Sequence, residues 1–147
     1  MAARLVVRAA QASDLNSVLR IERASFGPDA YDRNLFAEYL RKCGGLFLVA
    51  TEGDKVAGYS IACIHPGRAE LVSIAVRPGR RRQGGATALM DATLRRLTRR
   101  GIARITLMVK VSNAPAISFY EGVGFRKLRR VPRYYEDGSD ALLLVRE

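Results

Sequence analysis

The sequence predicts an α/β fold with one mixed sheet of about seven strands flanked by about four helices. Apolar runs typical of strands alternate with amphipathic helical stretches, and the expected element order is β-α-α-β-β-β-α-β-α-β-β. The chain of 147 residues is also long enough to bury one core. The strand ending at Val76, the following helix and the strand beginning at Ile105 are expected to form a right-handed βαβ unit. Ligands of such sheets bind where strands end and helices begin.

Hydrophobic spacing and turn residues give the expected boundaries of these elements. Strands are expected at residues 4–8, 46–51, 56–64, 70–76, 105–111, 125–131 and 141–145, and helices at 14–26, 32–40, 86–100 and 113–120. Ser13, Asp32 and Asn113 are candidate N-caps, because their side-chain oxygens can accept hydrogen bonds from the free N–H groups of a first helical turn. Gly27 and Gly44 are candidate helix stops.

Composition narrows the class of protein. Charged residues interrupt every apolar run before the roughly 18 residues that a membrane span needs, so we expect no transmembrane helix. The N-terminus lacks the apolar stretch of a secretory signal, which favours a cytoplasmic protein. Cys43, Cys63 and His65 match no metal-site pattern, so we expect two buried or semi-buried free thiols and no metal.

Positive charge is concentrated in one part of the chain. The formal net charge is +11, and nine arginines lie between Arg77 and Arg104 against one acid. Such a block binds nucleic acid, an anionic cofactor or an acidic partner, or forms the solvated face of a helix. Its position in the fold has to separate these alternatives.

An arginine- and glycine-rich loop, Arg77 to Ala86, joins an expected buried strand to the start of the long helix. Free N–H groups and the positive end of the helix dipole favour a phosphate at such a position. The loop has neither the GK[ST] of a Walker loop nor the GxGxxG of a dinucleotide fold. A phosphate site is therefore expected, and a simple connection is the alternative.

The segment Arg81 to Ala86, RRQGGA, resembles the Q/R-x-x-G-x-G/A acetyl-CoA signature of the GNAT acetyltransferases. The flanking segments Ser73 to Pro78 and Val111 to Phe125 also resemble that superfamily. The resemblance implies a single GNAT domain over residues 1–147 that transfers an acetyl group from acetyl-CoA to a primary amine. The residues that it implies for acetyl-CoA are Ile74, Ala75, Val76, Arg81, Arg82, Gln83, Gly84, Gly85, Ala86, Asn113 and Tyr120.

Within the superfamily, the chain resembles the ribosomal-protein N-terminal acetyltransferases and related Nα-acetyltransferases. The resemblance rests on Ile21-Glu22 with Phe26, on the segment from Ser112 to Phe125, and on the sequence YYEDGSDA that begins at Tyr134. It implies a peptide or protein N-terminus as acceptor, with a ribosomal protein as one candidate, and a monomer or homodimer. Nucleic acid is not expected as the substrate. The residues implied for the acceptor slot are Phe26, Tyr31, Tyr134 and Tyr135, with ordinary hairpin packing as the alternative for the last two.

The chain departs from these enzymes at the position of their proposed base, because LEVR or LHVR is replaced by LMVK and the position holds Met108. Tyr120 matches the family's general acid, with a core tyrosine as the alternative. Glu70 is a candidate base, because histone acetyltransferases of the superfamily carry a glutamate at the matching place. His65, or a water chain to backbone carbonyls, is the alternative base.

Two other functions remain open at this point. One is acetylation of lysine or a small-molecule amine, which would use the same donor site without a peptide slot. The other is a non-catalytic module that senses CoA or binds RNA.

Overall fold

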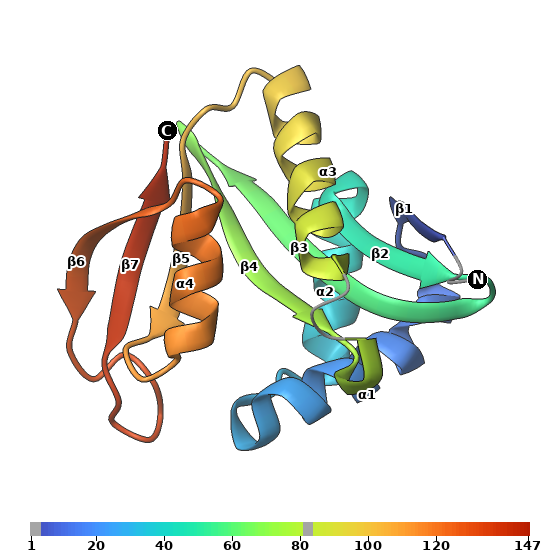
Figure 1. Ribbon diagram of the computed structural model, residues 1–147, viewed down its shortest axis with the longest axis horizontal. Helices are drawn as coiled ribbons and strands as arrows, with labels where there is room; N and C mark the ends of the chain where they lie inside the picture. The colour runs from blue at the N-terminus through green and yellow to red at the C-terminus, as the bar shows by residue number, and fades with distance from the viewer. Residues whose placement is uncertain (1–3, 81–83) are drawn as a thin grey trace.

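A computed structural model describes residues 4–80 and 84–147 of the protein (Figure 1). Within these residues, seven strands form one sheet in the order β1-β2-β3-β4-β5-β7-β6. Neighbouring strands are antiparallel, except that β4 and β5 are parallel, so the sheet is mixed as expected. The strands are β1 (Leu5–Ala9), β2 (Phe47–Glu52), β3 (Lys55–His65), β4 (Arg68–Val76), β5 (Ile105–Lys110), β6 (Arg126–Val131) and β7 (Ala141–Arg146).

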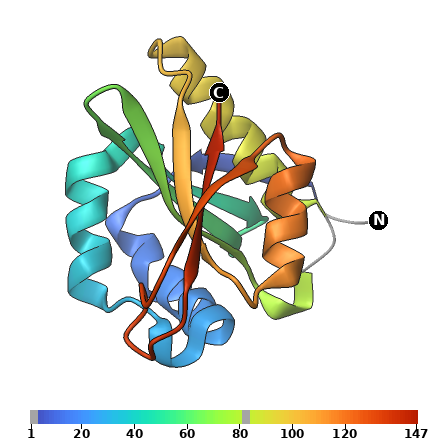
Figure 2. The same ribbon diagram turned by 90° about the vertical axis from the view of Figure 1, so that its left-hand side faces the viewer.

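Two pairs of helices cover the two faces of the sheet. In the described ranges, the four α-helices are α1 (Leu15–Phe26), α2 (Arg33–Cys43), α3 (Gly85–Arg99) and α4 (Ala114–Gly122). Figure 2 shows α1 and α2 on one side of the sheet and α3 and α4 on the other. None of these helices is long and apolar enough to cross a membrane. The expected α/β fold, its strand number and its helix number are confirmed.

The first helix begins differently from the prediction. A 3₁₀ turn, Ala12–Asp14, precedes α1, and Asp14 rather than Ser13 is its N-cap residue. The buried Asp14 carboxylate accepts hydrogen bonds from the Arg8 guanidinium at 2.8 and 2.9 Å and from the Gln11 N–H at 2.8 Å. The prediction of Ser13 as cap is wrong. The bonds from Arg8 hold Asp14 against β1, and the bond from Gln11 closes the 3₁₀ turn that contains Ser13. Asp32 caps α2 as expected and accepts from the Leu35 N–H at 2.9 Å.

Each face of the sheet carries its own core cluster. On the α1 and α2 side, Val18, Phe36 and Tyr59 are fully buried. On the opposite side, Met90 from α3 and Leu144 from β7 are almost completely buried. The apolar stripe predicted for the long helix therefore packs on the sheet, and the arginines near its C-terminus are left at or near the surface.

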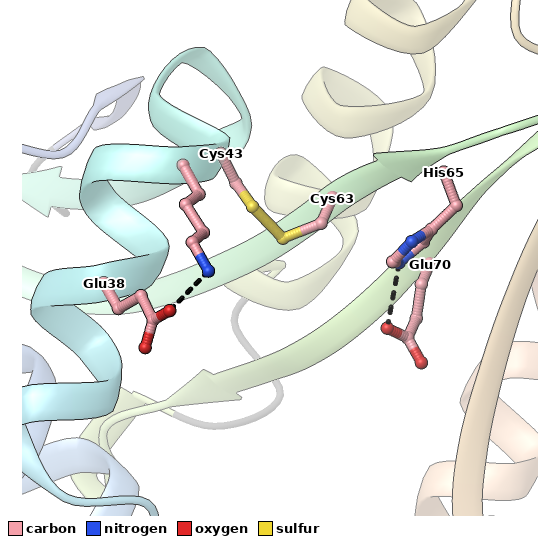
Figure 3. Close-up of a disulfide and its surroundings, with 6 residues drawn as sticks. Glu38, Cys43, Cys63, His65 and Glu70 are labelled. Atoms are coloured by element: carbon pink, nitrogen blue, oxygen red, sulfur yellow. Dashed lines mark hydrogen bonds and ion pairs between the residues drawn. A yellow bond between two sulfur atoms is a disulfide. The ribbon is translucent and has the colours of Figure 1, made fainter.

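The two cysteines form a disulfide, Cys43–Cys63, which joins the end of α2 to β3 (Figure 3). Their Cα atoms are 5.2 Å apart, although 20 residues separate them in the sequence. The expectation of free thiols is therefore wrong, while the expected burial holds for both cysteines, since Cys63 is 7% exposed and Cys43 is partly buried. The sequence could not predict the bond, because only the packing of α2 on β3 brings the two sulfurs together.

Candidate active site

The parallel strands β4 and β5 pair only at their first residues. Ala69 lies opposite Ile105 and Glu70 lies opposite Thr106, and no further β4–β5 pair occurs in the described ranges although both strands continue. Figure 1 shows the two strands running apart toward their C-terminal ends. One edge of β4 is thus left without a neighbouring strand at the place where ligands of α/β sheets bind.

A β-bulge in β4 lies where the strands separate. The consecutive β3 residues Ile61 and Ala62 face Ser73 and Leu71, so Val72 has no partner in the register. A bulge bends its strand and increases its twist. The bulge therefore explains why β4 turns away from β5 directly after their last shared pair.

The expected donor residues on β4 and α3 lie around this opening. Ile74 is half-buried, and Ala75 and Val76 are each 9% exposed. The helix α3 begins just after the strand, with Gly84 as N-cap at φ +84°, a left-handed conformation that glycine adopts without strain. The first N–H groups of α3, including that of Gly85, are the free donors expected for a phosphate.

Three of the expected pyrophosphate contacts, Arg81, Arg82 and Gln83, lie outside the described residues. Ala86 is half-buried in the first turn of α3. Asn113, expected near the pantetheine arm, is the N-cap of α4 and its Oδ1 accepts from the Ala116 N–H at 3.3 Å. Its carbonyl oxygen is thus engaged in the cap, which leaves its amide N–H groups to meet a ligand.

Tyr120, the expected general acid, projects from α4 into an aromatic group with Phe119 and Phe125. The ring centroids lie 5.5 and 5.9 Å from that of Tyr120. Burial raises the pKa of the Tyr120 phenol, and the neighbouring Tyr135 adds to the shift. The hydroxyl is therefore protonated at neutral pH, and no hydrogen-bond partner for it lies within the described residues. These properties are those of an available proton donor, although they are also compatible with a packed tyrosine.

Glu70 and His65, the two side chains considered as bases, lie side by side on β4 and β3 (Figure 3). The His65 Nε2 is 3.5 Å from the Glu70 Oε1, which is an ion-pair distance but too long for a hydrogen bond. The Glu70 side chain is 37% exposed. The pair lines a surface pocket of about 640 Å³ together with Tyr39 and the disulfide. Because Glu70 also forms the last pair with β5, it lies at the closed end of the opening.

Tyrosines from three separate segments meet beside this opening. Tyr31 precedes α2, Tyr39 lies in α2, and Tyr134 and Tyr135 lie in the loop between β6 and β7. The ring centroids of Tyr31 and Tyr39 are 6.5 Å apart and those of Tyr134 and Tyr135 are 4.9 Å apart. Burial raises the pKa of Tyr31 to about 12. The loops of Tyr31 and Tyr135 lie close together, because Lys110 forms ion pairs both with Asp29 in the first and with Asp137 in the second. Phe26, also expected in the acceptor slot, is partly buried against the core on the α1 and α2 side.

The structure also contains a buried acid that the sequence reasoning did not assign to the site. Glu22 in α1 is 1% exposed, and its carboxylate accepts hydrogen bonds from the hydroxyls of Tyr59 and Ser73 and, at 3.0 Å, from the Tyr31 N–H. Burial raises its pKa, against the effect of these donors. A signal was present, because Glu22 follows Leu15 at seven residues, on the apolar stripe of α1.

Met108 occupies β5 beside the opening and is half-buried. A thioether cannot accept a proton from an amine at neutral pH, so this position supplies no base. In the described part of the chain, no group of three or more histidine, cysteine or acidic side chains could hold a metal ion.

Known proteins with similar sequences are acetyltransferases. Residues 14–125 match the family model described as the acetyltransferase (GNAT) family. An N-alpha-acetyltransferase of Saccharolobus solfataricus is 35% identical, over 95% of this chain and 91% of its own.

Two solved structures have the same fold over nearly the whole chain. Ard1 from Thermoplasma volcanium superposes with a TM-score of 0.93 at 30% identity, over 97% of this chain and 96% of its own. A ribosomal-protein-alanine N-acetyltransferase from Escherichia coli gives a TM-score of 0.84 at 29% identity, over 97% and 92%. The fold implied by the sequence motifs is thus confirmed. The chain belongs to the acetyltransferase (GNAT) family and is an acyltransferase of the N-acetyltransferase class.

Proposed function

We propose that this enzyme transfers the acetyl group of acetyl-CoA to the α-amino group at the N-terminus of a peptide or protein. The observation that carries the proposal is that the loop of Tyr31 and the loop of Tyr134 and Tyr135, far apart in the sequence, are joined by the ion pairs of Lys110. Tyr31 is also linked to β4, because Glu22 accepts hydrogen bonds from both Tyr31 and Ser73. Aromatic side chains from two loops could pack on both sides of the first residues of an extended peptide. The names of the relatives described above point to the same class of acceptor.

The donor side of the proposal uses the opening between β4 and β5. The N–H groups of Gly84, Gly85 and Ala86 would hold the pyrophosphate, and residues 74–76 of β4 would line the path of the pantetheine arm. A single sheet from Leu5–Ala9 to Ala141–Arg146 supports our assignment of residues 1–147 to one domain.

The proposed chemistry is direct attack. The neutral amine nitrogen forms a bond to the thioester carbonyl carbon, and the carbon–sulfur bond then breaks. The excess proton on nitrogen passes to Glu70, directly or through water, with His65 as the neighbour that can relay it. The departing thiolate takes a proton from the hydroxyl of Tyr120, which is protonated at neutral pH. Water then returns a proton to the Tyr120 oxygen, and Glu70 releases the proton that it took to water.

The nature of the base favours an α-amine over a lysine. An α-amino group has a pKa of about 7.7–8.0, so an appreciable fraction is neutral at physiological pH, whereas a lysine amine at about 10.4 is almost wholly protonated. Met108 supplies no base, so the only acidic side chain that we assign to proton removal is Glu70, at the closed end of the opening. An α-amine, which is already partly neutral, therefore depends less than a lysine on a strong base in the active site.

One peptide can test the acceptor. A peptide with a small free N-terminal residue and one internal lysine is incubated with acetyl-CoA, and mass spectrometry locates the acetyl group. We expect acetylation of the α-amine in preference to the lysine. The matched control is the same peptide with a blocked N-terminus, which should not be modified. Exclusive lysine modification, or turnover only of a small polyamine, would reject the α-amine as acceptor while leaving acetyl transfer intact.

A further inference from the structure

Lys110, the last residue of β5, joins two loops that are far apart in the sequence. Its ammonium group forms ion pairs with Asp29, in the turn between α1 and α2, and with Asp137, in the loop between β6 and β7, at 3.0 Å for the latter. It also lies 5.2 Å from the centroid of the Tyr135 ring, a cation–π distance. One side chain therefore contacts both loops at once.

These two loops are the ones that carry the tyrosines of the proposed acceptor slot. Asp29 precedes Tyr31 by two residues, and Asp137 follows Tyr135 by two residues. Lys110 itself is two residues from Met108, so both side chains leave β5 on the same face of the sheet. Lys110 thus lies between the two sides of the slot, next to the position where related enzymes carry their base.

Lys110 and Asp137 both keep their charges at physiological pH. Hydrogen bonds to Asp29 and Asp137 raise the pKa of the Lys110 ammonium. Hydrogen bonds from Ser139, and then from Lys110, lower the pKa of Asp137 to about 2. The Lys110–Asp137 ion pair is therefore independent of pH near neutrality, but added salt should weaken it because both groups are partly exposed.

Other bonds fix the shape of each loop separately. The Glu22 carboxylate accepts from the Tyr31 N–H at 3.0 Å in the first loop. In the second, Tyr135 donates its N–H to the Ser139 carbonyl at 3.2 Å. These bonds do not link one loop to the other, whereas Lys110 contacts both.

We propose that Lys110 sets the distance between these two loops and is thereby a positioning residue for the acceptor, with no role in binding acetyl-CoA. The inference rests on the proposed function, because it takes the tyrosines of the two loops as the sides of the acceptor slot. A lysine at this place provides a flexible stem and three donors, which suits two carboxylates on opposite sides.

The test compares Lys110→Met, which keeps the length of the side chain and removes its charge, with Lys110→Arg, which keeps the charge. Lys127→Met is the control, because Lys127 is an exposed lysine on β6 whose side chain has no ion pair or hydrogen bond within the described residues. Steady-state kinetics use whichever amine the wild-type enzyme acetylates. Hydrogen exchange followed by mass spectrometry reports separately on segments 27–32 and 132–140.

We expect Lys110→Met to raise the KM for the acceptor roughly fivefold or more, from the loss of two ion pairs and one cation–π contact, with the KM for acetyl-CoA unchanged. Hydrogen exchange should become faster in both segments. Lys110→Arg should restore most of both properties, and the control should resemble the wild type. In an Asp29→Asn/Asp137→Asn background, Lys110→Met should have little further effect, because the contact is already lost.

Two results would overturn the inference. Unchanged exchange in both segments would show that Lys110 does not hold the loops. Faster exchange with an unchanged acceptor KM, or an equal rise in both KM values, would show that the contact does not position the acceptor. Failure of the wild type to acetylate any peptide N-terminus would instead contradict the proposed function, and the exchange measurements would still decide whether Lys110 joins the loops.

Discussion

The buried carboxylate of Glu22 offers the most direct test of how the core supports the acceptor side. It lies under the tyrosine loop and accepts hydrogen bonds from the Tyr59 hydroxyl, from the Ser73 hydroxyl at 3.3 Å and from the Tyr31 N–H at 3.0 Å. Replacement by glutamine keeps the shape of the side chain and removes its charge. Replacement by alanine removes the acceptor altogether.

The two replacements should lower the free energy of unfolding by different amounts, because they leave different groups without hydrogen-bond partners. With Glu22→Gln, the amide oxygen can still accept from the Tyr31 N–H, and its NH₂ can donate to the hydroxyls of Tyr59 and Ser73, which have lone pairs. We therefore expect a loss of only about 1 kcal/mol in the free energy of unfolding. With Glu22→Ala, the buried Tyr31 N–H loses its acceptor and the site loses packing, so about 2–4 kcal/mol is expected.

The effect of pH has a defined sign. Burial raises the pKa of Glu22 above its ordinary value of 4.5, so the folded protein favours the neutral carboxyl. Its contribution to stability is then fully present below about pH 4.5 and decreases as pH rises through the folded pKa. Glutamine does not titrate. The wild type's advantage over Glu22→Gln should therefore be larger near pH 4 than at pH 7.

Urea unfolding of the three proteins at several pH values, followed by circular dichroism, measures these differences. Comparing wild type with Glu22→Gln cancels the titration of all other groups. A difference that grows as pH rises would refute the reasoning, because it would show that the donors around Glu22 outweigh its burial. Equal losses for the glutamine and alanine variants would refute the assigned hydrogen bonds.

Three other changes test separate parts of the protein. Tyr120→Phe should lower kcat by about 10²–10⁴-fold with unchanged calorimetric affinity for acetyl-CoA, and near-normal turnover would leave Tyr120 a packing residue. Gly84→Ala and Gly101→Ala, at φ +84° and +74° at opposite ends of α3, should each cost about 1–2 kcal/mol, but only the first should weaken acetyl-CoA binding. Reduction by dithiothreitol should remove about 3 kcal/mol of stability through loss of the Cys43–Cys63 bridge across 20 residues, and a variant with both cysteines changed to serine should not respond.

Most of the fold could be predicted from the sequence, because each element carries its own local signal. The stop at Gly44 and the cap at Asp32 bound α2 as expected, and β2 and β3 form an antiparallel pair where strands were expected at residues 46–51 and 56–64. The expected cap at Ser13 failed for a reason that is not local. Asp14 is held by Arg8 from β1, and no pattern within the helix reveals such a contact.

The two halves of the candidate site differ in the same way, because one depends on local sequence signals and the other on contacts between distant segments. The donor side lies on regular elements of one continuous part of the chain, with residues 74–76 on β4, the first turn of α3 and the cap of α4. A short motif can therefore identify it. The acceptor side is assembled from Tyr31 near one end of the chain and from Tyr134 and Tyr135 near the other. Its geometry depends on tertiary contacts, such as those of Lys110, which no spacing in the sequence encodes.

The proposed donor and acceptor sides should tolerate substitutions differently. The donor side rests on the sheet and on helix ends, where a substitution disturbs the fold as well as the ligand. The acceptor side rests on loops held by a few polar bonds, where a substitution changes the slot at little cost to the core. Acceptor preference can therefore change while acetyl-CoA binding is kept. The ion pairs of Lys110 with Asp29 and Asp137 are polar bonds of this kind, whereas Met108 lies in β5 and belongs to the sheet.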